Sequence, residues 1–500
     1  MIGELLDTAI KKYPRLCDTA RDILEAKEGV TPMDRDLVDS IRKSVLIVAE
    51  PGDIDAATAP ASSPLNVPTF MGWHRNSDDP DAGTLAHWIL HGSPLGFDQM
   101  IQRQGIFPAS TGTPADEPTE AEIMRDAADW ENWPSAMEEK EDLHRLIREA
   151  EGKGFCSVVP DAKSAEDLAG GKVILNKLGV IVKNRLGKKK SRIIWDLRES
   201  GVNRKCDQSE RIVLPRLLDL VHSCLKLMRE GKRPILAAAD IEDAFHNVPA
   251  GQDRRYTVAL APMEDGKPCY VVYKVLVFGS RSSPTIWGRF AAFMGRTMSA
   301  VIPEAEGQVY VDDPVWVVPT EGGYSPEQVM TKIYLWAAIM GYPLKLPKSV
   351  AGSRIKWIGA EIEIDNTENK VIVSIPEDKV SSLVATCEEF LKKPVIGTRA
   401  LRSFAGSLAF VAGLVPLLRP FLSPLWAALS CDATDDGQPR PKSTKPRSRV
   451  AGKLVHTKRI ANSLVWIAGL LREEHGHRLV REFWADEVTS NLEVVTDASP

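Results

Sequence analysis

The spacing of apolar residues divides the 500-residue chain into stretches of different predicted secondary structure. Over about the first 60 residues, leucine, isoleucine and valine recur every three to four positions, a period that predicts amphipathic helices. From Gly154 the apolar residues form short runs rich in valine and isoleucine, which predict strands. Helices are expected to interrupt these strands around 214–228 and 287–301, and the chain is predicted to be helical again after Pro376.

Strands mixed with helices along the chain predict an α+β fold, with a sheet that carries helices on one face. Segments rich in proline, alanine, serine or threonine predict linkers between the folded parts. The strand-like runs are 172–183, 191–197, 234–241, 256–261, 269–279, 308–313 and 315–318, with a further pair within 355–375. The predicted linkers are 56–68, 110–120 and a basic segment at 432–448.

The composition is that of a globular protein, with 43% hydrophobic and 26% charged residues. These values exclude a wholly disordered, collagenous or coiled-coil chain, and the length suits about three structural units. The start of the chain lacks the features of a signal peptide, and the seven cysteines show no C-x-x-C spacing, so we expect an intracellular protein. The most apolar stretch, 404–429, is interrupted by Arg419, glycines and prolines, and therefore predicts buried helices rather than a membrane span.

Charge is distributed unevenly along the chain, although the formal net charge is only −5. Residues 1–150 contain 14 Lys and Arg against 28 Asp and Glu, whereas the remaining residues contain 49 against 40. Within 171–205 there are eleven basic and two acidic residues. A basic segment of this density suits a polyanion such as nucleic acid, although many charged runs are only solvated loops.

Three carboxylates are the strongest candidates for chemistry. Asp240 follows the apolar run 235–239, and Asp312 and Asp313 lie between two strand-like runs that are expected to form a hairpin with an Asp-Asp-Pro turn. If the strands are neighbours, the three carboxylates gather at one sheet edge, where they repel each other unless cations bind between them. Magnesium prefers such oxygen ligands, and two ions can activate a hydroxyl and stabilise departing pyrophosphate. Either element alone is also ordinary turn chemistry.

Taken together and in this order, the motifs of residues 150–430 resemble those of a reverse transcriptase of the retroelement type. The motifs are KKKSRIIWDLR (188–198), DIEDAF (240–245), FGSRSSP (278–284), YVDD (310–313), GYPLKLPKS (341–349) and WIG (357–359). The resemblance implies RNA-directed DNA polymerase activity, with a template and primer of RNA or DNA and with dNTPs as partners. No membrane partner is expected, and the oligomeric state stays open.

The resemblance also implies roles for individual residues. Asp240, Asp312 and Asp313 would be catalytic, and together with Ile241 they would hold two Mg²⁺ ions, for which Mn²⁺ could substitute. The nucleotide site would contain Lys189, Lys190, Arg192, Phe245, Gly279 and Lys348. Either of the two adjacent lysines could be the partner of the arginine, and the phenylalanine would exclude a ribose 2′-hydroxyl. The template and primer would meet Ser283, Pro284, Tyr310, Trp357 and Gly359.

The implied fold is a right-hand polymerase with fingers, a palm built on an antiparallel sheet, and a helical thumb or connection. The expected boundaries are 1–130 for an acidic, mostly helical N-terminal region of unknown role, 131–235 for the fingers, 236–375 for the palm and 376–490 for the thumb or connection. Residues 491–500 resemble the first strand of a ribonuclease H domain, with Asp497 as its first metal carboxylate. The motifs are most similar to DIRS-like or LTR-like elements.

Two other functions stay open from the sequence. The chain could be a non-catalytic nucleic-acid-binding relic of a reverse transcriptase, because Pro314 stands where the family has an aliphatic residue and removes a backbone N–H at the hairpin. The chain would also end just inside its ribonuclease H region. A polymerase that uses ribonucleotides is the third possibility, which Phe245 disfavours.

Overall fold

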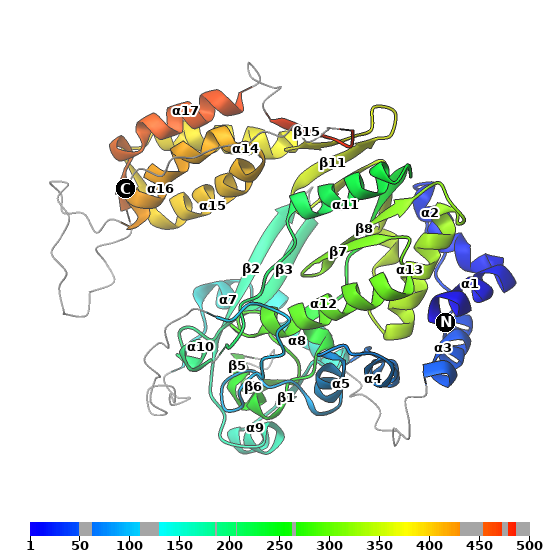
Figure 1. Cartoon of the computed structure of the whole chain (residues 1–500). Coiled ribbons are helices and arrows are strands. Elements are labelled where there is room, and N and C mark those ends of the chain that lie inside the picture. The colour runs from blue at the N-terminus through cyan, green and yellow to red at the C-terminus, as the bar shows by residue number, and fades with distance from the viewer. Residues whose placement is uncertain are drawn as a thin grey trace. The chain divides into compact units, whose positions relative to one another are not determined.

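The computed structural model in Figure 1 describes residues 1–49, 63–110, 130–185, 188–206, 208–262, 267–430, 454–472 and 479–486. Its contacts divide the chain into two compact units. The first unit comprises Met1–Leu220, Ala237–Val318 and Gly322–Val350, and the second comprises Val221–Leu236, Pro319–Glu321 and Ala351–Pro500. Helices and strands are mixed in both units, as the apolar pattern predicts. Most of the predicted linker residues, and Asp497, lie outside the described residues.

The N-terminal residues are helical, as predicted, and they belong to the same unit as the carboxylate motifs. The helices are α1 (Ile2–Lys12), α2 (Asp18–Leu24), α3 (Arg35–Ala49), α4 (Val67–Asn76) and α5 (Ala82–His91), with the 3-10 helix η1 (Pro14–Cys17). Helices α1 to α4 contact α13 (Pro326–Met340), and α5 contacts α12 (Ser283–Val301). The division between the units therefore does not fall at residue 130.

Buried polar contacts join the N-terminal region to the rest of the first unit. Asp81 and Arg289 form an ion pair in which both side chains are fully buried. The carboxylate of Asp253, also fully buried, accepts hydrogen bonds from the backbone N–H groups of Leu95 and Phe97. Buried charges need such partners, so these contacts fix the N-terminal region in one position.

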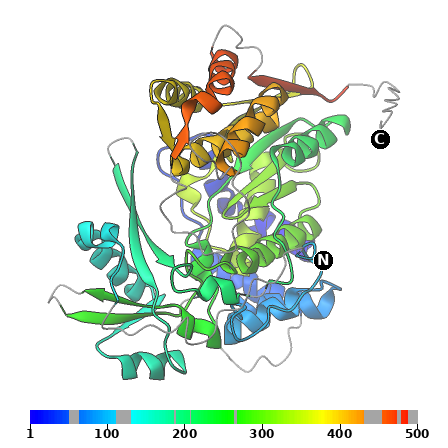
Figure 2. The same cartoon turned by 90° about the vertical axis from the view of Figure 1, so that its left-hand side faces the viewer.

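The segment predicted as fingers contributes strands to two small sheets with helices around them (Figure 2), and one of these sheets also contains two strands from the segment predicted as palm. Strands β2 (Lys177–Arg185) and β3 (Lys188–Asp196) make a long antiparallel ribbon. The second sheet has the order β1-β6-β5. The other elements are α7 (Pro134–Glu138), α8 (Lys140–Gly152), β1 (Cys156–Val159), α9 (Ala162–Ala169), α10 (Val202–Lys205), η4 (Gln252–Tyr256), β5 (Val258–Pro262) and β6 (Pro268–Tyr273).

A four-stranded sheet of order β7-β8-β4-β9 carries the carboxylate motifs. Its strands are β4 (Pro234–Ala238), β7 (Glu306–Tyr310), β8 (Asp313–Pro319) and β9 (Val350–Gly352), with the 3-10 helices η3 (Ala244–Asn247) and η5 (Leu346–Lys348) beside them. Helix α12 packs on β7, and the indoles of Trp287, Trp316 and Trp336 are among the largest fully buried side chains. The core therefore lies beneath the strands that end at the carboxylates.

The second unit combines a sheet of order β10-β11-β12-β15 with a group of helices. Its elements are α11 (Leu217–Arg229, which begins before the boundary), β10 (Arg354–Trp357), β11 (Ala360–Asp365), β12 (Lys370–Ser374), α14 (Glu377–Leu391), β13 (Val395–Gly397), α15 (Thr398–Leu414), η6 (Pro416–Leu418), α16 (Arg419–Ser430), β14 (Leu454–His456), η7 (Thr457–Arg459), α17 (Ala461–Leu471) and β15 (Val480–Trp484). The apolar stretch 404–429 forms α15 and α16, as predicted. Among the described residues, every helix is too short or too polar to cross a bilayer.

Candidate active site

The hairpin of β7 and β8 turns at Val311 and Asp312, because Tyr310 pairs directly with Asp313. The predicted Asp-Asp-Pro turn is wrong, since Asp313 and Pro314 already belong to β8. Val311 has a φ of 56°, a left-handed conformation that a β-branched residue rarely adopts. The indole Nε1 of buried Trp287 donates a hydrogen bond of 2.7 Å to the carbonyl of Val311 and holds this turn in place. A strained turn fixed by its surroundings is typical of functional sites.

Pro314 does not interrupt the hairpin. The register continues from Val309–Pro314 to Gln308–Val315 without a bulge. The carbonyl of Pro314 accepts a hydrogen bond of 3.1 Å from Ala239 N, and in a strand the N and O of one residue point to the same side. The missing N–H of Pro314 therefore concerns the ladder with β4, and the pairing of β7 with β8 is kept.

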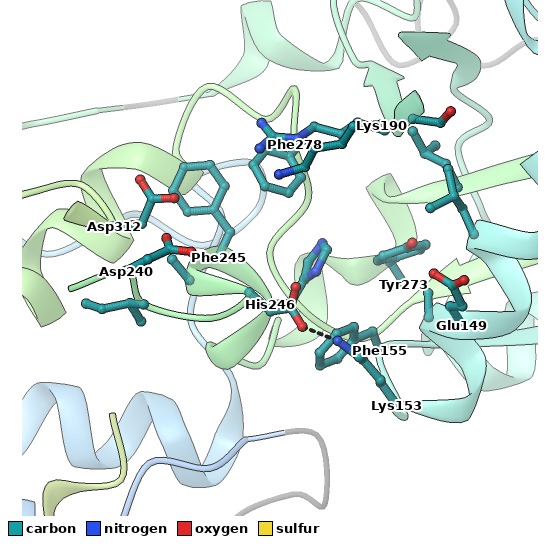
Figure 3. Close-up of a pocket in the computed structure, with 18 of the residues that line it drawn as sticks. Glu149, Lys153, Phe155, Lys190, Asp240, Phe245, His246, Tyr273, Phe278 and Asp312 are labelled. Carbon is teal, nitrogen blue, oxygen red and sulfur yellow. Dashed lines mark hydrogen bonds and ion pairs between the residues drawn. The ribbon is translucent and has the colours of Figure 1, made fainter. Parts of the chain in front are cut away.

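Asp240 is placed next to this turn by main-chain hydrogen bonds. Ile241 N donates to the carbonyl of Asp312 (2.8 Å), and Lys345 N donates to the carbonyl of Asp240 (2.8 Å). Figure 3 shows the side chains of Asp240 and Asp312 next to each other. Both residues, together with Ile241 and Asp313, line a cavity of about 700 Å³. The side chain of Ile241 is buried and apolar, so only its main-chain oxygen could meet a cation.

The carboxylates of this cavity lie in an environment that disfavours their charge. Burial and the nearby Asp240 raise the pKa of Asp312. Burial, Asp312 and Asp240 together raise the pKa of Asp313 to about 6. Within the part of the chain that the structure describes, no three His, Cys, Asp or Glu side chains converge closely enough to hold a metal ion by themselves. The predicted gathering of three carboxylates is thus a shared cavity rather than a finished metal cluster.

Basic side chains line the same cavity, but they are only partly the predicted ones. Lys190 and Arg192 line it, and the charge of Arg192, followed by burial, lowers the pKa of Lys190. Lys189 instead forms ion pairs with Glu139 (2.6 Å), the residue before α8, and with Asp142 of α8 (3.0 Å). Side chains alternate along a strand, so Lys190 and Arg192 share one face of β3, a signal that the sequence already contained.

The lysine nearest the carboxylates is Lys345, which the sequence analysis missed. Its Nζ lies 3.3 Å from the carboxylate of Asp240, and Lys345 lines the cavity. The predicted Lys348, three residues later in η5, is exposed and is not among the lining residues. Lys345 and Lys348 belong to the same motif, 341–349. The course of the main chain before η5 places Lys345 next to the carboxylate of Asp240.

Phe245 and Phe278 line the cavity, whereas the predicted Gly279 lies next to Phe278 and is not among the lining residues. The rings of Phe245 and Phe278 pack with centroids 5.0 Å apart. Gly279 has a φ of +116°, and a Cβ there would lie 1.9 Å from the carbonyl oxygen of Trp195. Trp195 N in turn donates to the carbonyl of Phe278 (3.1 Å). Only glycine allows this loop to approach β3 so closely.

Comparison with known families agrees with this geometry. Residues 180–362 match the family model described as reverse transcriptase (RNA-dependent DNA polymerase). This region is similar to reverse transcriptases. The match begins in β2 and ends in β11, so it includes the three carboxylates and supports a nucleotidyltransferase of this kind. No curated protein matches the chain.

The residues predicted to meet template and primer fall into both units. In the matched region of the first unit, Ser283 begins α12, and its Oγ donates a hydrogen bond to the carbonyl of Val277 (2.9 Å). Pro284 follows in the first turn of α12, and Tyr310 ends β7. In the second unit, Trp357 ends β10, and Gly359 is the second residue of the two-residue turn that joins β10 to β11. Gly359 takes the positive φ of 88° that this turn requires.

Replacing Gly279 by alanine is expected to lower the melting temperature and to reduce nucleotide incorporation by at least about tenfold, because the loop must move away from β3. The matched control is Gly295→Ala in α12, where no atom lies within 4 Å of the added Cβ. This control should be neutral or slightly stabilising, since alanine favours helices. Thermal unfolding and primer extension measure both effects. Equal behaviour of the two variants would contradict the close approach at Gly279.

Proposed function

We propose that the chain is the RNA-directed DNA polymerase of a retrotransposon, which extends a primer 3′-hydroxyl with dNTPs and releases pyrophosphate. The observation that carries the proposal is the placement of Asp240 and Asp312 side by side in one cavity within the region that matches reverse transcriptases. The proposal includes a DIRS-like or LTR-like origin and a ribonuclease H-like region that begins near Asp497, both supported by sequence motifs.

The donor set of the cavity fits magnesium. Mg²⁺ is usually bound by one or two carboxylates together with substrate phosphates, so Asp240 and Asp312 supply what the protein side of such a site needs. The raised pKa of Asp312 reflects burial and a neighbouring negative charge, both of which a cation would offset. The main-chain oxygen of Ile241 and the carboxylate of Asp313 are the further candidate ligands. When bound, two ions would activate the primer hydroxyl and stabilise the leaving pyrophosphate, and Mn²⁺ could replace Mg²⁺.

The chain's own residues perform the remaining tasks. Lys190, Arg192 and Lys345 bring positive charge to the cavity, where they would bind the triphosphate and balance the charge that develops on it. The Phe245 ring forms an apolar wall beside the carboxylates, in the position where the nucleotide sugar would lie. Base pairing with the template supplies the sequence information, so the protein needs to bind only backbone and shape.

The Phe245→Ala variant is expected to lose most of its preference for dNTPs, because the ring that would contact a 2′-hydroxyl is removed. We expect the ratio of kcat/KM for dTTP to kcat/KM for UTP to fall by about a hundredfold. Single-nucleotide extension with each substrate measures this ratio. If the parent protein shows no preference for dTTP over UTP, this result would favour the third possibility, a polymerase that uses ribonucleotides.

The direct test is magnesium-dependent incorporation of dTTP on a poly(rA)/oligo(dT) primer-template. Incorporation that depends on Asp312 would support the proposal, and its absence in the full chain would contradict it. Tight binding to the same duplex that weakens with salt, without incorporation, would instead favour the nucleic-acid-binding relic.

Substitution of Pro314 distinguishes the proposed polymerase from the relic hypothesis. Since the proline affects only the ladder with β4, Pro314→Val is expected to change incorporation by less than about threefold. Primer extension by both proteins is the measurement. An inactive parent chain that becomes active on this substitution would show that Pro314 had disabled the enzyme.

A further inference from the structure

A row of aromatic side chains connects Phe245 to the fingers (Figure 3). Phe245 packs on Phe278, and Phe278 meets the ring of His246 edge-on at 5.4 Å. His246 in turn meets the ring of Phe155 at 4.8 Å. Phe155 is 7% exposed and follows α8, so the row ends in the fingers. Because packed rings shift together, the position of the Phe245 ring depends on Phe155, at the other end of the row.

An ion pair fixes the main chain of the same segment. The Nζ of Lys153 lies 2.5 Å from the carboxylate of Asp243 and 3.7 Å from that of Glu242. Asp243 has a left-handed φ of 48° and directly precedes η3, which carries Phe245. The carbonyl of Asp243 accepts a hydrogen bond from Asn247 N (3.1 Å) and closes this short turn. Lys153 therefore holds the residue at which the turn begins.

The protonation states suit these two contacts. Burial lowers the pKa of Lys153, but the carboxylates of Asp243 and Glu242 outweigh burial and raise it overall, so the ammonium is charged. Burial lowers the pKa of His246 to about 4, so its imidazole is neutral and packs as an aromatic ring at neutral pH.

We propose that Lys153 and Phe155 are positioning residues that hold Phe245 in place and thereby set the discrimination between deoxyribonucleotides and ribonucleotides. This inference rests on the proposed polymerase function. Lys153 acts on the main chain of the turn through Asp243, and Phe155 acts on its side chains through His246. Neither residue is a candidate Mg²⁺ ligand. Loosening the turn that begins at Asp243 should therefore affect the discrimination between dNTPs and ribonucleotides more than it affects the rate with dNTPs.

The test compares Lys153→Met, Lys153→Arg and the control Lys163→Met in the full chain. Methionine keeps the length of the side chain and removes its charge, whereas arginine keeps the charge. Lys163 is an exposed lysine of α9 that does not line the cavity. We expect Lys153→Met to lower the dTTP-to-UTP ratio of kcat/KM by roughly fivefold, since partly exposed ion pairs contribute modestly. The kcat for dTTP should fall less than about twofold, and Lys153→Arg and Lys163→Met should keep the ratio.

A second measurement does not depend on catalysis. Hydrogen exchange at Asn247 N and Val248 N reports on the turn, because these groups donate to the carbonyls of Asp243 and Phe245. Lys153→Met and Phe155→Leu should both speed this exchange. An active enzyme whose sugar discrimination is unchanged in Lys153→Met would overturn the inference and leave the proposed function standing. If the parent chain incorporates no nucleotide, the proposed function fails, and unchanged exchange would then overturn the positioning role as well.

Discussion

Asp312→Asn is expected to lower magnesium-dependent nucleotide incorporation by about a thousandfold. Asp312 presents its carboxylate from the turn of β7 and β8, next to Asp240, which lies two residues after the end of β4 (Figure 3). Asparagine has almost the same size, so the strained turn and the bond from Trp287 are kept while the anionic oxygens that a hard cation requires are lost. Primer extension with enzyme in excess over primer-template measures the loss directly.

The same substitution should not destabilise the protein. Burial and Asp240 raise the pKa of Asp312, so the ionised carboxylate is less stable in the folded protein than in the unfolded chain. Stability from this group therefore declines as the pH rises through the carboxylate range, and asparagine avoids that decline. At pH 7 without divalent ions, we expect the melting temperature of Asp312→Asn to equal that of the parent or exceed it by about 1–3 °C.

Magnesium separates a ligand role from a structural role of Asp312. Added Mg²⁺ should raise the melting temperature of the parent chain, because an ion that binds only the folded state stabilises that state. Added Mg²⁺ should change the melting temperature of Asp312→Asn much less. The control Asp167→Asn changes an exposed residue of α9 outside the cavity and should keep both activity and the response to Mg²⁺. Loss of activity together with a large fall in melting temperature would show that Asp312 supports the fold instead.

Local sequence patterns predict the parts of the site that depend on residues adjacent in the chain, such as the strands that precede the aspartates. Apolar runs ending in aspartate predict that Asp240 and Asp312 follow strands, and the structure places them together. The exact turn could not be predicted, because Val311 is an unfavourable residue for positive φ. It adopts this conformation through a bond from Trp287, which lies 24 residues away in the chain. Long-range contacts of this kind leave no periodic signal.

Helix α13 was missed for a related reason. Most of its side chains are buried, so polar and apolar residues do not alternate with the period of a surface helix. The signal that was present is the cap: Ser325 accepts a hydrogen bond from Gln328 N, and the Gln328 side chain accepts one from Ser325 N. Such a capping box, followed by Pro326, marks the start of a helix even where the periodicity fails.

The role of the acidic N-terminal region also could not be predicted from sequence, since its partners are far away in the chain. Asp81 and Arg289 are separated by 208 residues, and both side chains are fully buried. The guanidinium donates from Nε to Asp81 (2.9 Å) and from Nη1 to the carbonyl of Gln102 (3.0 Å), and it stacks 4.3 Å from the ring centroid of Trp88. The N-terminal region therefore completes the burial of a charge on α12, which lies in the region that matches reverse transcriptases.

Asp81→Ala is accordingly expected to destabilise the protein by about 3–5 kcal/mol, because it leaves the buried guanidinium of Arg289 without its counter-ion. Denaturant unfolding followed by tryptophan fluorescence measures the change, and Trp88 lies beside the ion pair. The matched control Asp78→Ala removes an exposed carboxylate three residues earlier and should change stability by less than about 0.5 kcal/mol.

The double variant Asp81→Leu with Arg289→Met tests whether the cost comes from the unpaired charge. Apolar side chains of similar size should recover most of the stability, since a buried ion pair contributes little over a well-packed apolar pair. A strong coupling between the two positions would then show that they act as one unit. A loss below about 1 kcal/mol for Asp81→Ala would contradict this account, because it would mean that the guanidinium reaches solvent and that the N-terminal region is not fixed to α12 by this pair.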